Sequence, residues 1–113
     1  MSNRTKYNKL VRDKIPKIIR NSGNQCETVT LSNLDYLDYI EALKHKLVEE
    51  SKEVATASPK NLSQELADVM EVMDALMAAA GIEPEKVREI QKYKQSQCGG
   101  FDNKIKLLWT EKK

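Results

Sequence analysis

The sequence has little of several things that would assign it to a class. Only two of its 113 residues are cysteines, Cys26 and Cys98, and they form no Cys-x-x-Cys pair. This excludes a disulfide-rich scaffold and a thiolate zinc site. A single histidine, His45, excludes any site that needs two imidazoles. The longest apolar run, Ala75–Gly81, is far shorter than the ~20 residues that cross a bilayer. Three prolines and four glycines leave long helices possible.

No apolar segment of the kind that directs secretion opens the sequence, because residues 3–20 are densely charged. This composition predicts a cytoplasmic protein whose thiols stay reduced. At 113 residues the chain falls within the ~100–150 residues that are typical of one domain. We therefore predict a single domain over residues 1–113.

Neither sign of charge dominates the whole chain, since 19 basic and 17 acidic residues give a net charge of +2. This balance argues against a strongly basic nucleic-acid-binding protein. The two signs are nevertheless separated along the sequence. Residues 1–20 hold seven basic side chains and one acid, whereas residues 35–74 hold ten acids and four lysines. The sequence therefore has a basic arm followed by an acidic middle.

Most of the sequence has the pattern of helices. The expected helices cover about residues 14–20, 34–57, 59–80 and 84–96. Asp13 is the expected cap of the first helix, and Pro59 is expected at the first position of the third. β-Branched or alternating residues predict short strands at Cys26–Leu31 and Phe101–Trp109. The predicted fold class is mainly α, an antiparallel helical bundle with short N- and C-terminal β segments.

The third predicted helix has much apolar surface. Its expected core stripe steps by three or four residues through Leu62, Leu66, Val69, Met73, Leu76 and Ala80. Beyond Asp68 the helix is apolar on most faces, which is typical of a helix that is buried all round or paired with a second chain. We predict that it completes the bundle in a homodimer or a dimer of dimers. The alternative is a central core helix in a monomer.

Two of the helices each carry a pair of carboxylates at i,i+3 spacing. Glu50 and Glu53 form a Glu-x-x-Glu pair in the second predicted helix, and Glu65 and Asp68 form a Glu-x-x-Asp pair in the third. Residues three apart lie on one side of a helix. Glu50 also continues the apolar stripe that contains Leu47, so it is expected on the core-facing side. The alternative is a solvated acidic face that neighbouring lysines stabilise.

The short break at Ser58–Pro59 predicts that these two helices pack antiparallel, which would bring the four carboxylates together. Carboxylates at that distance repel one another, and their burial is costly unless a cation joins them. Oxygen ligands without histidine or cysteine suit Mg²⁺, with Mn²⁺ as a substitute. Mg²⁺ held by carboxylates completes its coordination with water and substrate phosphates. The acidic pairs therefore predict a Mg²⁺ site.

Three ordered motifs resemble those of a known superfamily. KLVEESKE at 46–53, followed by QELADVMEVMDAL at 64–76, resembles the all-α nucleoside triphosphate pyrophosphohydrolases, the MazG-like and phosphoribosyl-ATP pyrophosphohydrolase-like superfamily. YNKLVRDKIPKII at 7–19 and GGFDNKI at 99–105 resemble the opening and closing motifs of a small single-domain branch. The resemblance covers nearly the whole chain.

The resemblance implies a Mg²⁺-dependent enzyme that cleaves a nucleotide between its α- and β-phosphates and gives a nucleoside monophosphate and pyrophosphate. Carried over by position, the metal ligands are Glu50, Glu53, Glu65 and Asp68. Glu49 belongs to the same motif as an outer ligand or water-activating base, and Glu53 joins it as a catalytic carboxylate. The implied role is housekeeping of the nucleotide pool.

Cations are expected to contact the phosphates of such a substrate. The candidates in the basic arm are Lys9, Arg12 and Lys14, because arginine offers a bidentate fork and lysine a point charge. A solvated basic surface is the alternative. Lys94, in the last predicted helix, is a further candidate. The sequence departs from the branch at Cys98, where an arginine often precedes Gly-Gly-Phe, so one expected phosphate contact is missing.

Two other functions stay open on the sequence. The enzymatic alternative is a phosphoribosyl-ATP pyrophosphohydrolase of histidine biosynthesis, which the two terminal motifs favour less. The non-enzymatic alternative is a helical dimer whose basic arm binds nucleic acid through its charge. The acidic middle and the lack of a recognised DNA-binding motif disfavour it. We expect a nucleotide polyphosphate as the partner, and neither nucleic acid nor a membrane.

Overall fold

The computed structural model describes residues 4–32 and 35–113, and within those ranges it contains four helices and no strand. The predicted mainly α fold is confirmed to this extent. The chain divides into two compact units, Met1–Gly81 and Ile82–Lys113. The prediction of a single domain stays a prediction. None of the four helices has the length and apolarity needed to cross a bilayer.

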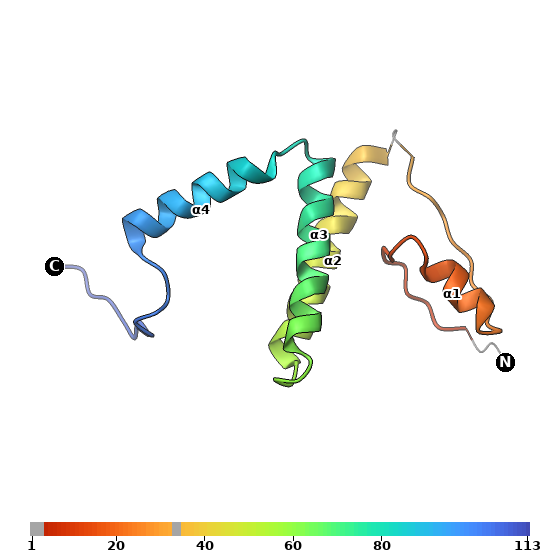
Figure 1. Cartoon of the computed structure of the whole chain (residues 1–113), viewed down its shortest axis with the longest axis horizontal. Helices are drawn as coiled ribbons and strands as arrows, with labels where there is room; N and C mark the ends of the chain where they lie inside the picture. The colour runs from red at the N-terminus through yellow and green to blue at the C-terminus, as the bar shows by residue number, and fades with distance from the viewer. Residues whose placement is uncertain (1–3, 33–34) are drawn as a thin grey trace. The chain divides into compact units, whose positions relative to one another are not determined.

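In the first unit a segment without helix or strand leads into α1, Ile15–Asn21, which is drawn in orange in Figure 1. Pro16 lies in its first turn, where the missing N–H costs no helical hydrogen bond. The predicted cap is wrong, because Lys14 and not Asp13 occupies the N-cap position and no side chain caps the helix. The short helix carries the last two cations of the basic arm, Lys17 and Arg20.

α2 (Tyr36–Thr56) and α3 (Leu62–Ala79) form the antiparallel hairpin that the sequence predicts, and they lie side by side in Figure 1. In the turn between them the Asn61 N–H donates to the Ser58 carbonyl. Pro59 lies in this turn and not in α3, which corrects the predicted start of that helix. Gly81 follows α3 with a φ of 69°, as expected for the residue that ends a helix.

The two helices meet along a narrow strip of side chains. Leu43 of α2 and Val72 of α3 are buried, and Leu47, Val54 and Leu76 are partly buried. Helical spacing places these residues on the facing sides of the hairpin. The contact strip is apolar at both ends, and three partly buried acids, Glu50, Glu65 and Asp68, lie along it.

The predicted core stripe of α3 is only partly right. Val69 and Leu76 are partly buried, but Leu62, Leu66 and Met73 are exposed. These three share one side of the helix with exposed Met70, because the four positions are spaced by three or four residues. The hairpin thus has an outer apolar stripe (Leu62, Leu66, Met70 and Met73) next to its contact strip.

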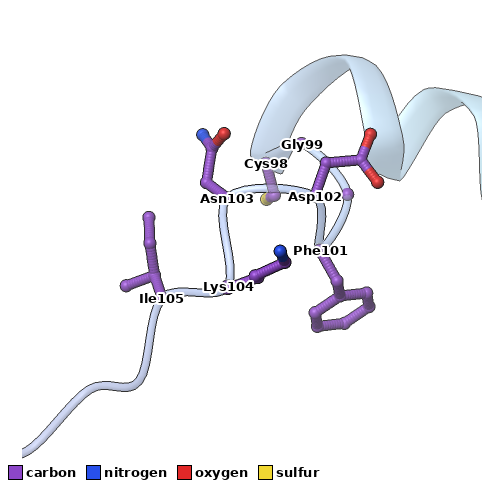
Figure 2. A pocket seen from close by; sticks show the side chains of 8 residues that line it. Cys98, Gly99, Phe101, Asp102, Asn103, Lys104 and Ile105 are labelled. Carbon is purple, nitrogen blue, oxygen red and sulfur yellow. The ribbon is translucent and has the colours of Figure 1, made fainter.

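The second unit consists of α4 (Pro84–Cys98) and a C-terminal segment without helix or strand. Gly99 ends α4 with a φ of 84°, a conformation that favours glycine. The next residues curl into a loop, Cys98–Ile105, around an open hollow of about 450 Å³ (Figure 2). Phe101 in this loop is almost fully exposed.

Neither predicted β segment is a strand in the structure. Residues 26–31 and 101–109 form no strand and no inter-strand hydrogen bond within the described ranges. A strand requires a neighbour whose backbone groups pair with its own. Within its own unit, the described part of the chain offers Cys26–Leu31 no strand to pair with.

Candidate metal centre

Three carboxylates of the hairpin converge. Glu50 of α2 and Glu65 and Asp68 of α3 each offer an oxygen, and these oxygens all lie within 4.8 Å of one another. All three residues are partly buried. Glu50 is the most enclosed of the ion-paired acids, with 14% of its side chain exposed, as its place in the apolar stripe predicts. The antiparallel packing of two short motifs therefore builds one acidic cluster.

The cluster is electrostatically strained at Glu65. Burial raises the pKa of this carboxyl, and the negative charges of Asp68, Glu53 and Glu50 raise it further. Among the described residues no basic side chain lies within ion-pair distance of Glu65. A raised pKa with three acids as its neighbours is the condition that a bound cation relieves.

Replacing Glu65 with Gln should raise the free energy of unfolding at neutral pH when no divalent ion is present. Since the folded state raises the pKa of Glu65, ionisation costs stability. This cost in unfolding free energy is absent below the pKa that Glu65 has in the unfolded chain. It is complete above the raised pKa that Glu65 has in the folded chain. The gain over the parent protein should therefore disappear in acid, as urea unfolding at several pH values will measure. Glu71→Gln, on the exposed side of the same helix, is the control and should give no such pH-dependent gain.

Glu53 lies one turn beyond Glu50 on α2 and is exposed. It is not part of the converging trio, although its charge acts on Glu65. Its assignment as a fourth ligand and catalytic carboxylate stays a prediction. An exposed glutamate on the last turns of a helix has the rotamer freedom to turn toward a bound ion.

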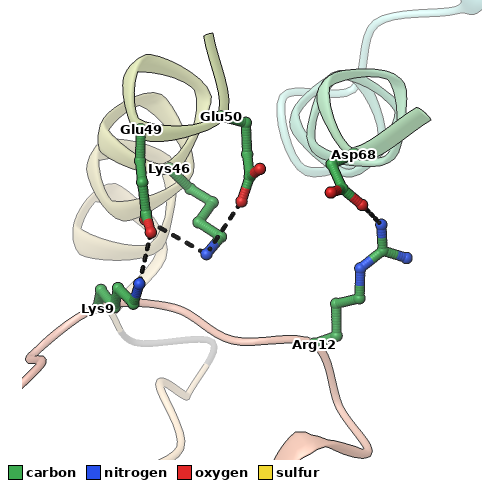
Figure 3. A network of polar contacts seen from close by, with 6 residues as sticks. All are labelled: Lys9, Arg12, Lys46, Glu49, Glu50 and Asp68. Atoms are coloured by element: carbon green, nitrogen blue, oxygen red, sulfur yellow. Dashed lines mark hydrogen bonds and ion pairs between the residues drawn. The ribbon is translucent and has the colours of Figure 1, made fainter. Parts of the chain in front are cut away.

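The basic arm lies against the acidic cluster, as Figure 3 shows. Arg12 Nη2 is 2.7 Å from Asp68 Oδ1, although the two residues are 56 positions apart in sequence. Lys9 donates to Glu49 Oε1 across 40 positions. The division of charge along the sequence therefore corresponds to a contact in space.

Glu49 receives cations from two sides. Besides Lys9, Lys46 of α2 lies with its Nζ 3.3 Å from Glu49 Oε2. The hydrogen bond from Lys9 lowers the pKa of Glu49, and Lys46 adds to this effect against the opposing effect of burial. The same contact raises the pKa of Lys9. Glu49 is therefore held as a carboxylate of low basicity while Lys9 stays in place.

No ion pair among the described residues joins the other two predicted phosphate-binding residues, Lys14 and Lys94, to the acids. Lys14 is exposed at the N-cap of α1. Lys94 is exposed on α4, in the second unit. Their roles stay predictions. The structure instead adds Lys46, which contacts Glu49 and Glu50. The sequence indicates this contact, because Lys46 precedes the two acids by three and four residues and such residues are neighbours on a helix.

An acidic cluster shared by two antiparallel helices is the arrangement of the MazG-like all-α nucleoside triphosphate pyrophosphatase superfamily, and the chain falls in this class. Residues 23–94 match the sequence profile of phosphoribosyl-ATP pyrophosphohydrolase, and the chain belongs to this family. Comparison with curated proteins and with solved structures gave no significant match.

The match includes both acidic pairs and ends before the closing loop. It begins after the basic arm, so Lys9, Arg12 and Lys14 lie outside it. Family membership makes the chain a pyrophosphohydrolase, a hydrolase of phosphoanhydride bonds, with an acidic cluster that can hold a metal ion. The family match therefore says nothing about the basic arm. A role for the arm rests only on the contacts of Lys9 and Arg12 with the acids.

Proposed function

We propose that the chain is a Mg²⁺-dependent nucleoside triphosphate pyrophosphohydrolase. It adds water across the α–β phosphoanhydride bond and releases a nucleoside monophosphate and pyrophosphate, in housekeeping of the nucleotide pool. The convergence of Glu50, Glu65 and Asp68 in a chain of this family carries the proposal. The donors are all hard oxygens, which suit Mg²⁺, and Mn²⁺ as a substitute.

Counting charges supports one resident ion. Three basic side chains, those of Lys9, Arg12 and Lys46, contact the acids. The acids of the two motifs number five: Glu49, Glu50, Glu53, Glu65 and Asp68. Five negative and three positive charges leave −2, which one divalent ion balances. Bound there, the ion would neutralise phosphate charge and polarise the phosphorus toward attack.

The arm supplies cations that can pass from the acids to the substrate. Arg12 is 55% exposed in its side chain and belongs to a segment without helix or strand, so a polyphosphate can reach it. Bidentate arginine–phosphate contacts are strong and specific. If Lys9 moves to phosphate in the same way, the pKa of Glu49 rises toward its ordinary value. Glu49 then becomes a better base for the attacking water.

Arg12→Ala should raise KM for the nucleotide about tenfold, the effect of losing one charge-assisted hydrogen bond. The same change should tighten Mn²⁺ binding in the absence of nucleotide, because Asp68 loses the cation 2.7 Å away. Steady-state kinetics and titration calorimetry measure the two constants. Lys17→Ala, which removes one exposed charge from α1, is the control. Equal effects of both variants would contradict a specific contact.

The family name favours a second candidate substrate, phosphoribosyl-ATP, in histidine biosynthesis. It carries the same α–β phosphoanhydride, so the chemistry of the site does not distinguish the two. A pyrophosphate-release assay over canonical and modified nucleoside triphosphates and phosphoribosyl-ATP, each with Mg²⁺ and with Mn²⁺, decides between them. Pyrophosphate from phosphoribosyl-ATP alone would replace the first proposal by the second. No pyrophosphate from any of them would refute both.

A further inference from the structure

Lys46 differs from the other cations near the acidic cluster in where it comes from. It belongs to α2, the helix that carries Glu49 and Glu50, whereas Lys9 and Arg12 reach the site from the arm (Figure 3). Its Nζ lies 3.3 Å from Glu49 Oε2 and 3.3 Å from Glu50 Oε1. One ammonium group thus joins a carboxylate of the converging trio to a carboxylate outside it.

The burial of this contact separates it from an ordinary helix-surface ion pair. Only 16% of the Lys46 side chain and 14% of the Glu50 side chain are exposed. Lys44 and Glu41, on the same helix and also three residues apart, form a pair at 3.4 Å whose side chains are 59% and 63% exposed. Ion pairs of the second kind contribute little to stability or geometry. The enclosed pair restricts its side chains far more.

We propose that Lys46 is a positioning residue of the hydrolytic site, which holds Glu50 toward Glu65 and Asp68 and Glu49 toward the attacking water. This inference rests on the proposed function. A carboxylate has two oxygens, and Lys46 engages one oxygen of Glu50, so the other can serve a metal ion. Glu49 is held in the same way from the opposite side of the ammonium group. Lys46 stays in place when arm cations move to a substrate, because its own helix anchors it.

Lys46→Met tests this role, because methionine keeps an unbranched apolar stem and removes only the ammonium group. We expect kcat for the best nucleotide to fall roughly tenfold to a hundredfold, since small misplacements of reacting groups have effects of this size. KM should change less than about threefold, because Lys46 acts through Glu49 and Glu50, which its ammonium group contacts. Binding of Mn²⁺ alone, followed by electron paramagnetic resonance, should persist, because Glu50, Glu65 and Asp68 all remain and the loss of a nearby positive charge favours the ion. A variant that had merely lost its fold would lose Mn²⁺ binding as well.

Two further variants make the result decisive. Lys46→Arg keeps the charge within reach of both carboxylates and should recover most of kcat, whereas Lys44→Met on the exposed side of α2 should leave kcat and KM as in the parent. The inference fails if Lys46→Met matches Lys44→Met, or if a folded Lys46→Arg is as slow as Lys46→Met. Circular dichroism will show whether Lys46→Met folds. If it does not fold, Lys46→Arg decides the question: a kcat like that of the parent protein supports the positioning role, and a large loss of kcat refutes it. An inactive parent protein would instead refute the proposed function.

Discussion

Asp68→Asn should lower the rate of pyrophosphate release by about a hundredfold or more. This is the effect expected when the substitution neutralises a carboxylate that helps to hold an ion, because that ion stabilises the charge of the transition state. Asp68 is one of three residues whose oxygens lie within 4.8 Å of one another, so an amide at this position would weaken the binding of the ion. It would also remove the negative charge that pairs with Arg12 at 2.7 Å, leaving an amide oxygen that accepts only a neutral-acceptor hydrogen bond. Both changes affect the site, whereas the fold should survive. The half-exposed ion pair contributes less than about 1 kcal/mol to folding.

The hairpin offers a matched control for this experiment. Asp74→Asn makes the same chemical change on the same helix at an exposed position outside the cluster, and it should leave the rate unchanged. Initial rates at saturating Mg²⁺ and Mn²⁺ titrations of both variants separate loss of metal from loss of chemistry. Equal activity of Asp68→Asn and the parent protein would place the site elsewhere in the chain.

Glu53→Gln tests whether a fourth carboxylate joins the three converging acids in holding the ion. Glu53 lies outside the converging trio but on the same motif. If it turns toward the ion, its amide should cost as much activity as Asp68→Asn. If it is a solvated residue, the variant should behave like Asp74→Asn, and three carboxylates would then hold the ion.

The acidic cluster was predictable from the sequence because its determinants are local. The i,i+3 spacing fixes each pair on one side of its helix, and a short turn forces the helices to be antiparallel. Glu50 continues the spacing of Leu43 and Leu47, so its enclosure follows from position alone. Such features depend on the periodicity of a helix and need no knowledge of distant segments.

The partners of the cluster were not predictable in the same way. Arg12 and Asp68 are 56 residues apart, and composition shows only that the two regions carry opposite charge. Periodicity also failed on α3, because apolar residues occupy more than one side of that helix. The stripe through Leu62, Leu66 and Met73 fits helical spacing as well as the true contact side through Val72 does. Where apolar residues are in excess, spacing cannot tell which side meets which neighbour.

The outer apolar stripe leads to the second large effect, which concerns assembly. We expect the chain to be a dimer in solution, or a dimer of dimers, with Leu62, Leu66, Met70 and Met73 at the contact between copies. These side chains are between 39% and 58% exposed, and they follow one another along one side of α3. Covering each of them contributes about 1 kcal/mol or more, according to the apolar area removed from water. A continuous stripe of this kind marks an interaction surface in preference to a solvated one.

Met70→Glu should convert such a dimer into a monomer, because each interface would then bury two unpaired carboxylates at a cost of several kcal/mol. Light scattering and sedimentation over a wide range of concentrations measure the mass of the parent and the variant. Ser63→Glu, an exposed polar position in the first turn of α3, is the control and should leave the mass unchanged. A parent protein that stays monomeric up to its solubility limit would contradict the dimer. The stripe would then have to be covered from within the chain. In that case Met70→Glu should lower the unfolding temperature without changing the mass.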